Sequence, residues 1–498
     1  MPNQELPIVP RLSKSKYMSG LQCHKRLYLE SHSPELASET DEQTQARMDM
    51  GTEVGQLARQ RFPGGVLVGF KEYSRNEALK RTADLLNDPK VPAIFEGAFE
   101  FDNVLVRPDV LERVNKDKWR LIEVKSSTEA KEEYFDDLAI QKYVLMGVGV
   151  PPTGSWLMYI NNQYVYPGGE LDLQQFFALQ DLTAETATQE REVPARLAAM
   201  KAMLTTASPP AIEPDHHCHE PYDCAFWDHC TQAKPERWVY YLPGGKRTFD
   251  KLVQEGIGTI DEIAAGFKLT DVQQKMKNNR EWVCSELKAA LRTVQYPVHH
   301  LDFETLMLAI PKYPQTRPYQ TIPFQWSNHV AETEAGQVRH EHYLCAERRD
   351  PREELTVSLL KSLGRGGSIC VYSGYEKRML TELGAAFPRL KPELDRIIER
   401  LWDLLSIIKE HYYHPGFEGS FSIKSTLPAV LPSLSYGDLE IQEGGMASLQ
   451  YYKMIYEVTD PAEKERIRQA LLKYCERDTL AMVELRRVLL AKSNTVAG

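Results

Sequence analysis

Long apolar runs are missing from this chain of 498 residues. No stretch approaches the about 18 consecutive apolar residues that a membrane-spanning helix needs, and residues 1–16 lack the apolar core of a signal peptide. We therefore expect a cytoplasmic protein with no membrane partner. Internal repeats and low-complexity segments are also missing, so a repeat architecture is not expected.

An excess of positive charge is missing as well, because 60 Lys and Arg residues stand against 70 Asp and Glu residues. The formal net charge of −10 argues against a protein that coats nucleic acid nonspecifically. This net charge does not exclude an enzyme that binds nucleic acid at a local site, since carboxylate-rich metal sites add negative charge. Residues 11–29 form one basic segment without an acid, which predicts either a solvated helix face or phosphate contacts. Its basic residues are Arg11, Lys14, Lys16, Lys25 and Arg26.

Cysteine is too scarce, at 8 residues, for a disulfide scaffold. Four cysteines stand singly in apolar or helical contexts, and we expect them to be buried core residues. They are Cys284, Cys345, Cys370 and Cys475. A phosphate-binding loop is also absent, because Gly245-Lys246 is followed by Arg247 where Ser or Thr is needed.

The length predicts two or three domains. Breaks rich in Pro or Gly lie at 205–215 and 242–245, and we expect a first domain over 1–235, a helical linker over 236–295 and a second domain over 296–498. Both large domains are predicted to be mixed α/β. Hydrophobic periodicity predicts helices at 40–61, 73–86, 135–147, 351–363, 376–385, 391–410 and 463–492, and strands at 93–101, 104–113, 119–125, 154–166 (a pair), 298–303, 321–330, 338–345 and 368–373.

Acidic and basic residues alternate on two neighbouring strands of the first predicted domain. Asp109 lies in VLVRPDVLERV, while Glu123 and Lys125 lie in KWRLIEVKSST. The two-residue spacing puts Glu123 and Lys125 on one face of a strand. Two carboxylates can hold Mg²⁺ or Mn²⁺, and the ammonium can orient the attacking water or stabilise charge at phosphorus. The alternative is a pair of surface strands whose charges face water.

The helices around this motif carry a family resemblance. The downstream helix holds Gln141 and Tyr143, and the upstream helix contains GTEVGQLARQ. With the D…ExK pattern, they make residues 10–230 resemble the RecB-type members of the PD-(D/E)xK nuclease superfamily. The resemblance implies that Gln141 belongs to the active site. In two respects the chain departs from the family. Gly55 stands where a metal-binding His is common, so that this ligand is either missing or supplied by another group such as Glu53, and Gln141 and Tyr143 are closer together than usual.

Three clustered cysteines and one distant cysteine bracket this predicted domain. Cys218, Cys224 and Cys230 are evenly spaced, and Cys23 lies far upstream. Four thiolates suit an iron–sulfur cluster or tetrahedral Zn²⁺. The arrangement resembles the iron–sulfur RecB-type nucleases, including the CRISPR-associated ones, and implies a 4Fe–4S cluster on these four residues. Zinc stays open, with a nearby histidine replacing Cys23, as do unligated core cysteines. The histidines are His216, His217, His219 and His229.

A second set of acids lies in the last predicted domain. Asp302 and Glu304 are two apart on a strand, and Tyr474 and Asp478 are one helical turn apart near the C-terminus. A strand D-x-E with a helix Y-x-x-x-D resembles the DnaQ-like, RNase H-fold 3′–5′ exonucleases of the DEDD type. The resemblance implies that the carboxylates bind two metal ions and that the tyrosine positions the attacking water.

The third acidic position of that family follows a strand and opens a helix. Glu376 takes this place after SICVYSG, with Asp350 and Asp403 as weaker substitutes. Lys424, in the segment between the motifs, is expected either to reach a phosphate or to be solvated. Nearly the whole chain resembles a bacterial family of unassigned function in which two nuclease-like domains are fused.

These patterns predict a metal-dependent enzyme that degrades or trims DNA from ends or single strands with Mg²⁺ or Mn²⁺ at both sites. Clearing of foreign DNA and processing of repair intermediates would both fit. Two alternatives stay open. One is a nucleic-acid-binding clamp in which one nuclease site has decayed, and the other is an RNA-trimming enzyme.

Overall fold

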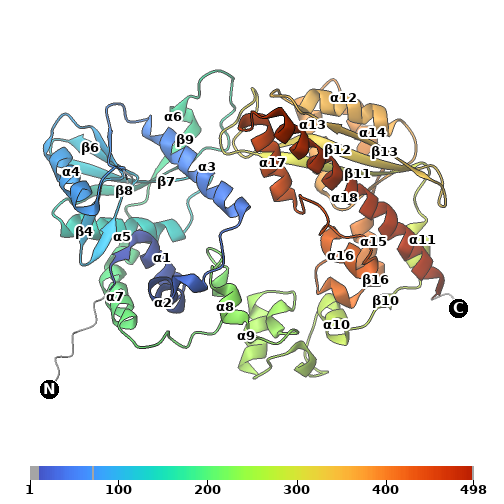
Figure 1. Cartoon of the computed structure of the whole chain (residues 1–498), viewed down its shortest axis with the longest axis horizontal. Helices are drawn as coiled ribbons and strands as arrows, with labels where there is room; N and C mark the ends of the chain where they lie inside the picture. Colours follow the sequence, from blue (N-terminus) through green and yellow to red (C-terminus); the bar gives the residue numbers. More distant parts are fainter. Residues whose placement is uncertain (1–9, 70–71, 496–498) are drawn as a thin grey trace. The chain divides into compact units, whose positions relative to one another are not determined.

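The computed structural model describes residues 10–69 and 72–495. The chain divides into two compact units (Figure 1). The first comprises Met1–Lys234 and Ala309–Tyr319, and the second comprises Pro235–Leu308 and Gln320–Gly498. The excursion back into the first unit is held by backbone pairing between Tyr166 and Thr316 and by Ile310, which packs in an apolar cluster of that unit. Within the described residues, no helix is both long and apolar enough to cross a membrane.

The first unit is built on a six-stranded mixed sheet in the order β2-β3-β6-β7-β8-β9. The central strand β7 is antiparallel to β6 and parallel to β8. Helices cover both faces, and each face has its own apolar cluster. The strands are β2 (Val66–Leu67), β3 (Ala93–Phe95), β6 (Val110–Asn115), β7 (Lys118–Lys125), β8 (Pro152–Ile160) and β9 (Phe177–Asp181).

The helices of the first unit lie close to their predicted ranges where predictions were made. They are α1 (Lys14–Gln22), α2 (His24–His32), α3 (Glu42–Arg59), α4 (Arg75–Asn87), α5 (Glu133–Gly147), α6 (Leu173–Phe176), α7 (Ala187–Leu204) and α8 (Trp227–Thr231). The strand pair expected at 154–166 is wrong, because only β8 forms there. Its antiparallel partner β9 comes later in the chain, after the turn-rich segment 161–172.

A small sheet fixes the beginning of the described chain. Strand β1 (Leu12–Ser13) pairs in parallel with β5 (Val104–Val106), which is antiparallel to β4 (Phe99–Phe101). Ser13 then caps α1 by accepting a hydrogen bond from the backbone N–H of Lys16. Lys14, the first residue of α1, is therefore held at a fixed place beside the main sheet.

The second unit contains a five-stranded mixed sheet in the order β13-β12-β11-β14-β15. β11, β12 and β13 are antiparallel neighbours, while β14 and β15 run parallel to β11. One face packs on α12, α13 and α14, and the long helix α18 packs on β11 and β12. The strands are β11 (Val298–Met307), β12 (Thr321–Ala331), β13 (Val338–Leu344), β14 (Ser368–Val371) and β15 (Leu401–Asp403).

The helix expected at 391–410 is wrong in its middle, because β15 interrupts it. Residues 401–403 pair with the edge of β14, and Asp403 then caps α15 through the N–H groups of Leu405 and Ser406. A sheet edge supplied by distant residues overrides the local helical pattern. The helices are α12 (Arg352–Leu363), α13 (Tyr375–Ala386), α14 (Lys391–Ile398), α15 (Leu404–His411), α16 (Ile423–Val430), α17 (Gly444–Tyr456) and α18 (Pro461–Thr495).

The segment 236–295, expected as a separate linker, is grouped with the second unit. Its strand β10 (Trp282–Val283) pairs with β16 (Tyr412–Tyr413), and its helices are α9 (Lys246–Gln254), α10 (Asp271–Asn278) and α11 (Leu287–Leu291). Cys284 follows β10, and the expectation that it is a buried core residue is wrong. Its side chain is half-buried and donates a hydrogen bond to Glu286. Cys345, Cys370 and Cys475 are buried.

Candidate functional site

The first acidic motif lies on β6 and β7 of the first unit. Asp109 immediately precedes β6, and its Oδ2 accepts a hydrogen bond of 2.7 Å from the backbone N–H of Val124 on β7. This bond holds the Asp109 carboxylate beside the strand that carries Glu123 and Lys125. Glu123 is 1% exposed, so the alternative of solvated surface strands does not apply to it.

The Glu123 carboxylate is fully engaged by cationic and amide donors. Lys125 Nζ lies 2.9 Å and Lys14 Nζ 2.8 Å from its Oε1, and Gln141 Nε2 donates to its Oε2 at 2.7 Å. Lys125 also pairs with Asp137 on α5. The structure thus brings the predicted site residues Glu123, Lys125 and Gln141 into contact. Lys14 and Asp137 belong to the same cluster.

The charges in this first cluster shift one another's pKa. Burial, reinforced by the Glu123 charge, raises the pKa of Asp109 to about 7. Burial also opposes ionisation of Glu123, but the Lys125 and Lys14 ammonium groups outweigh it and hold the pKa of Glu123 below its usual value. Burial likewise opposes charge on Lys14, yet Asp137 and Glu123 raise the pKa of Lys14. Asp109 is therefore the acid whose ionisation is least supported by the protein.

Sequence reasoning missed two members of this cluster. Lys14 was grouped with a basic segment whose expected role was solvation or phosphate contact, although the structure directs it inward. Asp137 stands four residues before Gln141, so helical spacing could have placed it on the same face of α5. A further, half-buried carboxylate, Glu96, lies near enough for its charge to contribute to the raised pKa of Asp109.

The departures from the family pattern have structural counterparts. Space around Gly55 is open, because an added Cβ would meet no atom within 4 Å. Glu53, considered as a substitute ligand, lies 3.6 Å from Lys312 Nζ rather than in the Glu123 network. Tyr143 donates to Asp102 at 3.1 Å. No contact of Glu53 or Tyr143 with Asp109 or Glu123 is found within the described part of the chain.

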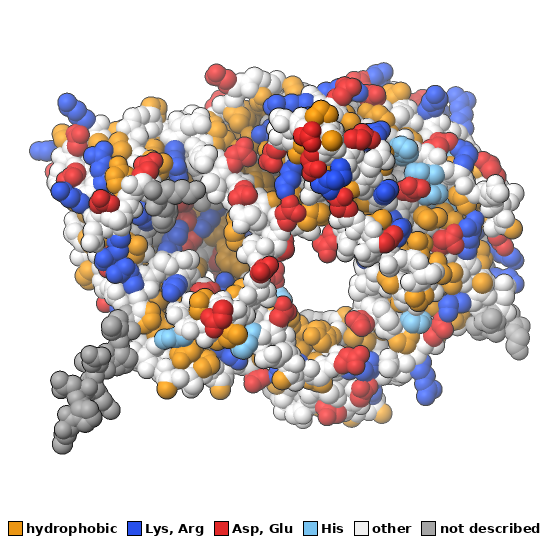
Figure 2. Space-filling view, in the orientation of Figure 1, with side chains coloured by type: hydrophobic (Ala, Val, Ile, Leu, Met, Phe, Trp, Pro, Cys, Tyr) orange, Lys and Arg blue, Asp and Glu red, His pale blue; other side chains and the backbone are white. Residues whose placement is uncertain are grey.

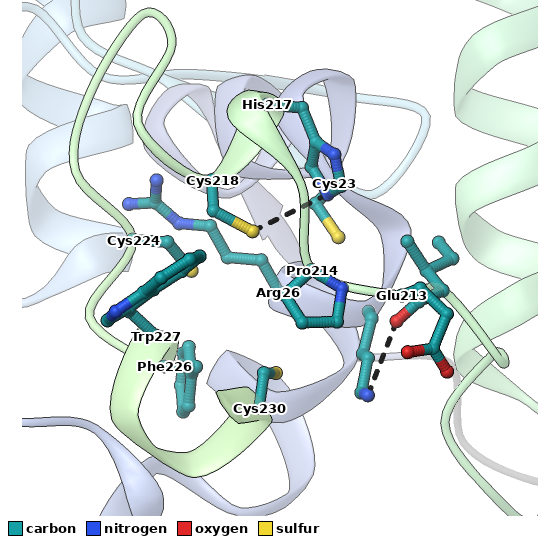
Figure 3. A pocket seen from close by; sticks show the side chains of 12 residues that line it. Cys23, Arg26, Glu213, Pro214, His217, Cys218, Cys224, Phe226, Trp227 and Cys230 are labelled. Carbon is teal, nitrogen blue, oxygen red and sulfur yellow. Dashed lines mark hydrogen bonds between the residues drawn. The ribbon is translucent and has the colours of Figure 1, made fainter. Parts of the chain in front are cut away.

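The four cysteines gather around one pocket of the first unit (Figure 3). Cys23 caps the start of α2, Cys218 ends a short 3-10 helix, Cys224 follows it and Cys230 lies on α8. Cys23 is therefore brought beside the three others from nearly two hundred residues away. His217 Nε2 lies 3.6 Å from Cys218 Sγ, and the side chains of Lys25 and Arg26 line the same pocket.

The donor chemistry of this pocket fits a thiolate-bound metal group. Burial, together with the smaller effect of the other three thiols, raises the pKa of Cys218 to about 11. Such mutual repulsion favours binding of a cationic centre, which deprotonates its ligands. Tetrahedral Zn²⁺ requires sulfur atoms about 3.8 Å apart, given Zn–S bonds of about 2.3 Å. No three of these four sulfur atoms all lie within 4.8 Å of one another in the described part of the chain. The thiols are therefore farther apart here than tetrahedral Zn²⁺ requires.

The second acidic motif lies on the central strand of the other sheet. Phe303 packs in the apolar cluster beneath α12 and α13, so the neighbouring Asp302 and Glu304 face the opposite side, toward α18. The Sγ of Cys475 on α18 is 3.9 Å from Asp302 Oδ2, and donor atoms of Asp302, Glu304 and Cys475 lie within 4.8 Å of one another. Asp478 is one turn from Tyr474 on the same helix, as the spacing predicts.

Carboxylates from three elements interact strongly in this second cluster. The pKa of Asp302 is raised well above its usual value. Burial is the largest cause, and the charges of Asp478, Glu304 and Glu376 add to it. Burial and Asp478 do the same to Glu304. Burial raises the pKa of Asp478 to about 6, although a 2.5 Å hydrogen bond from the Tyr436 hydroxyl to Asp478 Oδ1 opposes the rise.

Glu376 opens α13 directly after β14, as predicted. It is buried, its Oε2 has no hydrogen-bond partner among the described residues, and burial raises its pKa to about 7. The two substitutes for this position have other partners, although the charge of Asp403 also contributes to the raised pKa of Glu376. Asp350 pairs with Arg352 at 2.6 Å, and Asp403 caps α15.

Lys424 and two tyrosines complete the surroundings of Asp478. Lys424 Nζ lies 5.1 Å from the ring centroid of Tyr474 and 5.6 Å from that of Tyr436. The Lys424 charge also opposes the rise in the pKa of both Asp478 and Glu304. Tyr436 was not singled out from the sequence, because a lone tyrosine in the loop before α17 carries no spacing pattern.

Comparisons with known proteins give matches to parts of the chain. A family model described as a domain of unknown function (DUF2779) matches residues 299–422, which include Asp302, Glu304 and Glu376 but not Tyr474 or Asp478. Among solved structures, the crystal structure of SSO0001 is 16% identical, covers 40% of this chain and 78% of that chain, and has a TM-score of 0.21. No curated protein matches.

Proposed function

We propose that this protein is a metal-dependent nuclease with its main catalytic centre at Asp302, Glu304, Glu376 and Asp478. The observation that carries the proposal is the convergence of these four carboxyl groups from β11, α13 and α18, three of them buried and Asp302 half-buried, with raised pKa values. Buried like charges destabilise one another unless a cation joins them. All-oxygen ligands select Mg²⁺ or Mn²⁺, which would supply Lewis-acid stabilisation of the phosphoryl oxygens.

The neighbouring side chains fit phosphodiester hydrolysis. Tyr474 orients the attacking water, and Lys424 stabilises negative charge on the phosphate. Tyr436 holds Asp478 in the ionised form that a metal ion requires. A D-x-E on the central strand and a Y-x-x-x-D on the packed helix support the assignment to the DnaQ-like, RNase H-fold exonucleases, and therefore stepwise removal of nucleotides from a 3′ end.

The first cluster is proposed as a second cleavage site of the PD-(D/E)xK type. Asp109 and Glu123 would hold Mg²⁺ or Mn²⁺, and Lys125 would act on the water and the transition state. One observation favours a rival role for it: Glu123 is already paired with two lysines, and a metal ion must displace at least part of that pairing. The second candidate function is thus a nucleic-acid clamp in which only the cluster on β11 cleaves.

The thiol quartet is proposed to bind a 4Fe–4S cluster that ties α2 to the segment around α8. We propose DNA as the substrate and the cytoplasm as the location, with processing of repair intermediates or foreign DNA as the role. RNA is the alternative substrate.

A digestion panel tests these proposals. End-labelled single- and double-stranded DNA and RNA are incubated with the protein and Mg²⁺, Mn²⁺ or EDTA, and the products are resolved by length. We expect a ladder shortening from the 3′ end of DNA that EDTA abolishes. Uncut substrates with either metal would reject the nuclease, and a ladder on RNA alone would replace DNA by RNA.

A further inference from the structure

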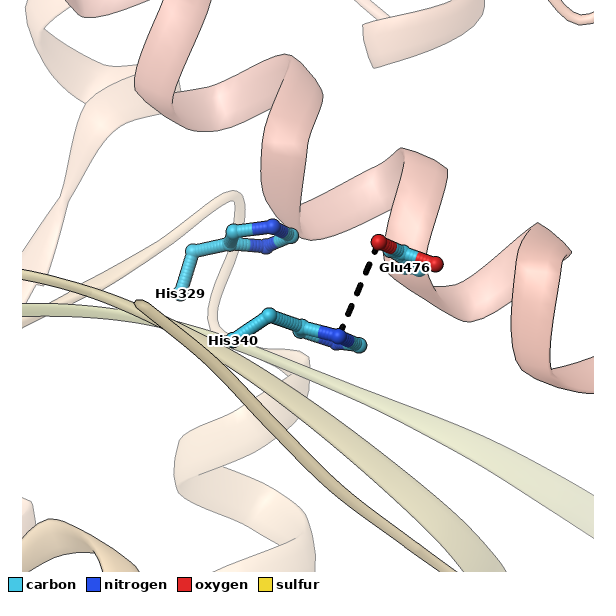
Figure 4. Close-up of side chains that lie close together, drawn as sticks. All are labelled: His329, His340 and Glu476. Carbon is cyan, nitrogen blue, oxygen red and sulfur yellow. Dashed lines mark ion pairs between the residues drawn. The ribbon is translucent and has the colours of Figure 1, made fainter. Parts of the chain in front are cut away.

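A group of metal-ligand side chains lies on the second unit outside the carboxylate cluster (Figure 4). His329 on β12 and His340 on β13 are direct cross-strand partners, and Glu476 on α18 faces them. One ligand atom from each of the three residues lies within 4.8 Å of the other two. The His340 Nδ1 is 3.6 Å from Glu476 Oε1.

Hydroxyl groups on the far side of the two rings contact one nitrogen of each imidazole. His329 Nδ1 is 2.8 Å from Thr479 Oγ1, and the Thr479 hydroxyl itself is 3.1 Å from the carbonyl of Glu476. When the Thr479 hydroxyl donates to that carbonyl, its oxygen accepts from the His329 Nδ1–H. Ser327 continues the chain: its hydroxyl is 2.7 Å from Thr479 Oγ1 and 2.9 Å from His340 Nε2.

If Ser327 donates to Thr479, it accepts from the His340 Nε2–H. The remaining nitrogens, His329 Nε2 and His340 Nδ1, are then left unprotonated. Hydrogen bonds from the second ring nitrogen to such acceptors are what orient histidines that bind metal ions. The arrangement prepares two imidazole lone pairs beside a carboxylate.

The imidazoles are also kept neutral near pH 7. Burial, assisted by His340, lowers the pKa of His329 to about 4. Burial lowers the pKa of His340 too, although Glu476 opposes this shift. The two rings are stacked with centroids 4.4 Å apart, which two imidazolium cations would not tolerate.

We propose that His329, His340 and Glu476 bind one divalent transition-metal ion of the Zn²⁺ class. Two imidazoles and one carboxylate prefer such an ion to Mg²⁺, the reverse of the preference of the all-carboxylate set. The Glu476 side chain is 46% exposed, so one coordination position is open to water and the ion can enter from solvent. Figure 2 shows histidine side chains grouped at the surface of the second unit near β13.

The ion would join β12 and β13 to α18. That helix also carries Tyr474 and Asp478, so the bound ion would fix the helix against the sheet at a point one turn or less from both residues. Metal binding here is independent of whether the protein cleaves nucleic acid, and its test needs no activity.

Co²⁺ titration of EDTA-treated full-length protein provides the test, because Co²⁺ bound to nitrogen and oxygen has visible absorption bands without the strong near-ultraviolet bands of thiolate ligands. The variants are Glu476→Gln and His340→Gln. The matched control is Glu484→Gln, the same change on the same helix, where Glu484 pairs with Arg487 instead. We expect wild type and control to bind one more nitrogen- and oxygen-ligated Co²⁺ than either variant, and Zn²⁺ to displace it.

Thermal unfolding supplies a second readout for the same four proteins. Zn²⁺ should raise the Tm of wild type and control and raise it less in Glu476→Gln, because an ion that binds only the folded state stabilises it. Equal Co²⁺ stoichiometry and equal affinity, within about twofold, in all four proteins would overturn the proposal. Because Glu476 is half-exposed, its amide variant should fold even if His340→Gln does not.

Discussion

Lys14 Nζ lies 2.8 Å from Glu123 Oε1, although 109 residues separate them in the sequence. The parallel pairing of β1 with β5 positions the start of α1, and the first residue of that helix then reaches the acidic strand. A second cation, Lys125, contacts the same oxygen. Glu123 is thus neutralised within the first cluster, whereas the four acids of the second cluster have Lys424 and Arg477 as the cations whose charges act on Asp478 among the described residues.

Lys14→Gln should lower the stability of the metal-free protein by about 2 kcal/mol. Removing one partner of a buried ion pair typically costs about 3–5 kcal/mol, and the partial exposure of Lys14 and the remaining Lys125 reduce this. The control is Lys16→Gln, at a lysine of the same helix whose ammonium group donates to Ser31 Oγ at 3.4 Å. Urea unfolding in EDTA measures the free energy of unfolding of both variants. An equal loss of stability in the two would show that the contacts of Lys14 with the cluster do not stabilise the fold.

Glu376→Gln should change how stability depends on pH. The pKa of Glu376 is raised from 4.5 to about 7 in the folded protein, so the folded state holds this proton more tightly than the unfolded state. Wild type should therefore lose stability relative to Glu376→Gln as pH rises from about 4.5 through 7, by about 3 kcal/mol, and change no further above that range. Chemical unfolding of both proteins in EDTA at pH 5–8 gives this difference, and a pH-independent difference would refute it. Buried histidines contribute equally to both proteins and cancel.

Asp302→Asn should stop the stepwise shortening of a 5′-labelled strand from its 3′ end while the fold is retained. The amide keeps the shape of the side chain but removes a charge that a hard cation needs. Asp395→Asn, an exposed acid on α14 paired with Lys391, is a control for charge loss alone. Ladders that match wild type in Asp302→Asn would remove the second cluster from catalysis.

Two tyrosine variants should act differently. Tyr436→Phe removes the hydrogen bond to Asp478, so the pKa of Asp478 should rise above its value of about 6. The rising limb of the pH–rate profile should then move to higher pH, because Asp478 ionises only at higher pH. Tyr474→Phe should slow the reaction with little change in metal affinity, since it removes a water-orienting hydroxyl. Identical profiles for wild type and Tyr436→Phe would contradict the role given to this bond.

Lys125→Ala should reduce cleavage at the first cluster by about two to three orders of magnitude, tested in an Asp302→Ala background. Loss of a transition-state stabiliser typically costs about 3 kcal/mol or more. Asp109→Asn should abolish metal binding there. If Asp302→Ala alone removes all cleavage, the first unit is a clamp and not a second active site.

Cys224→Ser should remove the brown colour, with broad absorbance near ~400 nm, expected of anaerobically purified protein. The variant should also loosen the first unit, because a metal group there joins the segment around Cys23 to that around Cys230. Cys284→Ser, at a half-buried cysteine of the other unit, is the control. Colourless wild-type protein with stoichiometric zinc and no iron would replace the cluster by zinc.

Local spacing predicted the side chains that share one element. Glu123 and Lys125 face the same side of β7, and Tyr474 and Asp478 lie one turn apart on α18, because strand and helix periods are fixed by the backbone. Ranges such as α3, α4 and α12 followed from apolar periodicity for the same reason. The interrupted helix at 391–410 did not, since the sheet edge that pairs with residues 401–403 is formed by β14 elsewhere in the chain.

The residues that carry acid, base and thiol chemistry can be read from the sequence, which also predicted two mixed α/β domains. Which of these groups come into contact depends on the tertiary structure. Lys14 turns inward because β1 pairs with β5, and Tyr436 reaches Asp478 across 42 residues. His329, His340 and Glu476 converge because one strand register and one helix packing coincide. Such contacts depend on long-range pairing and burial, which leave no periodic trace in the local sequence.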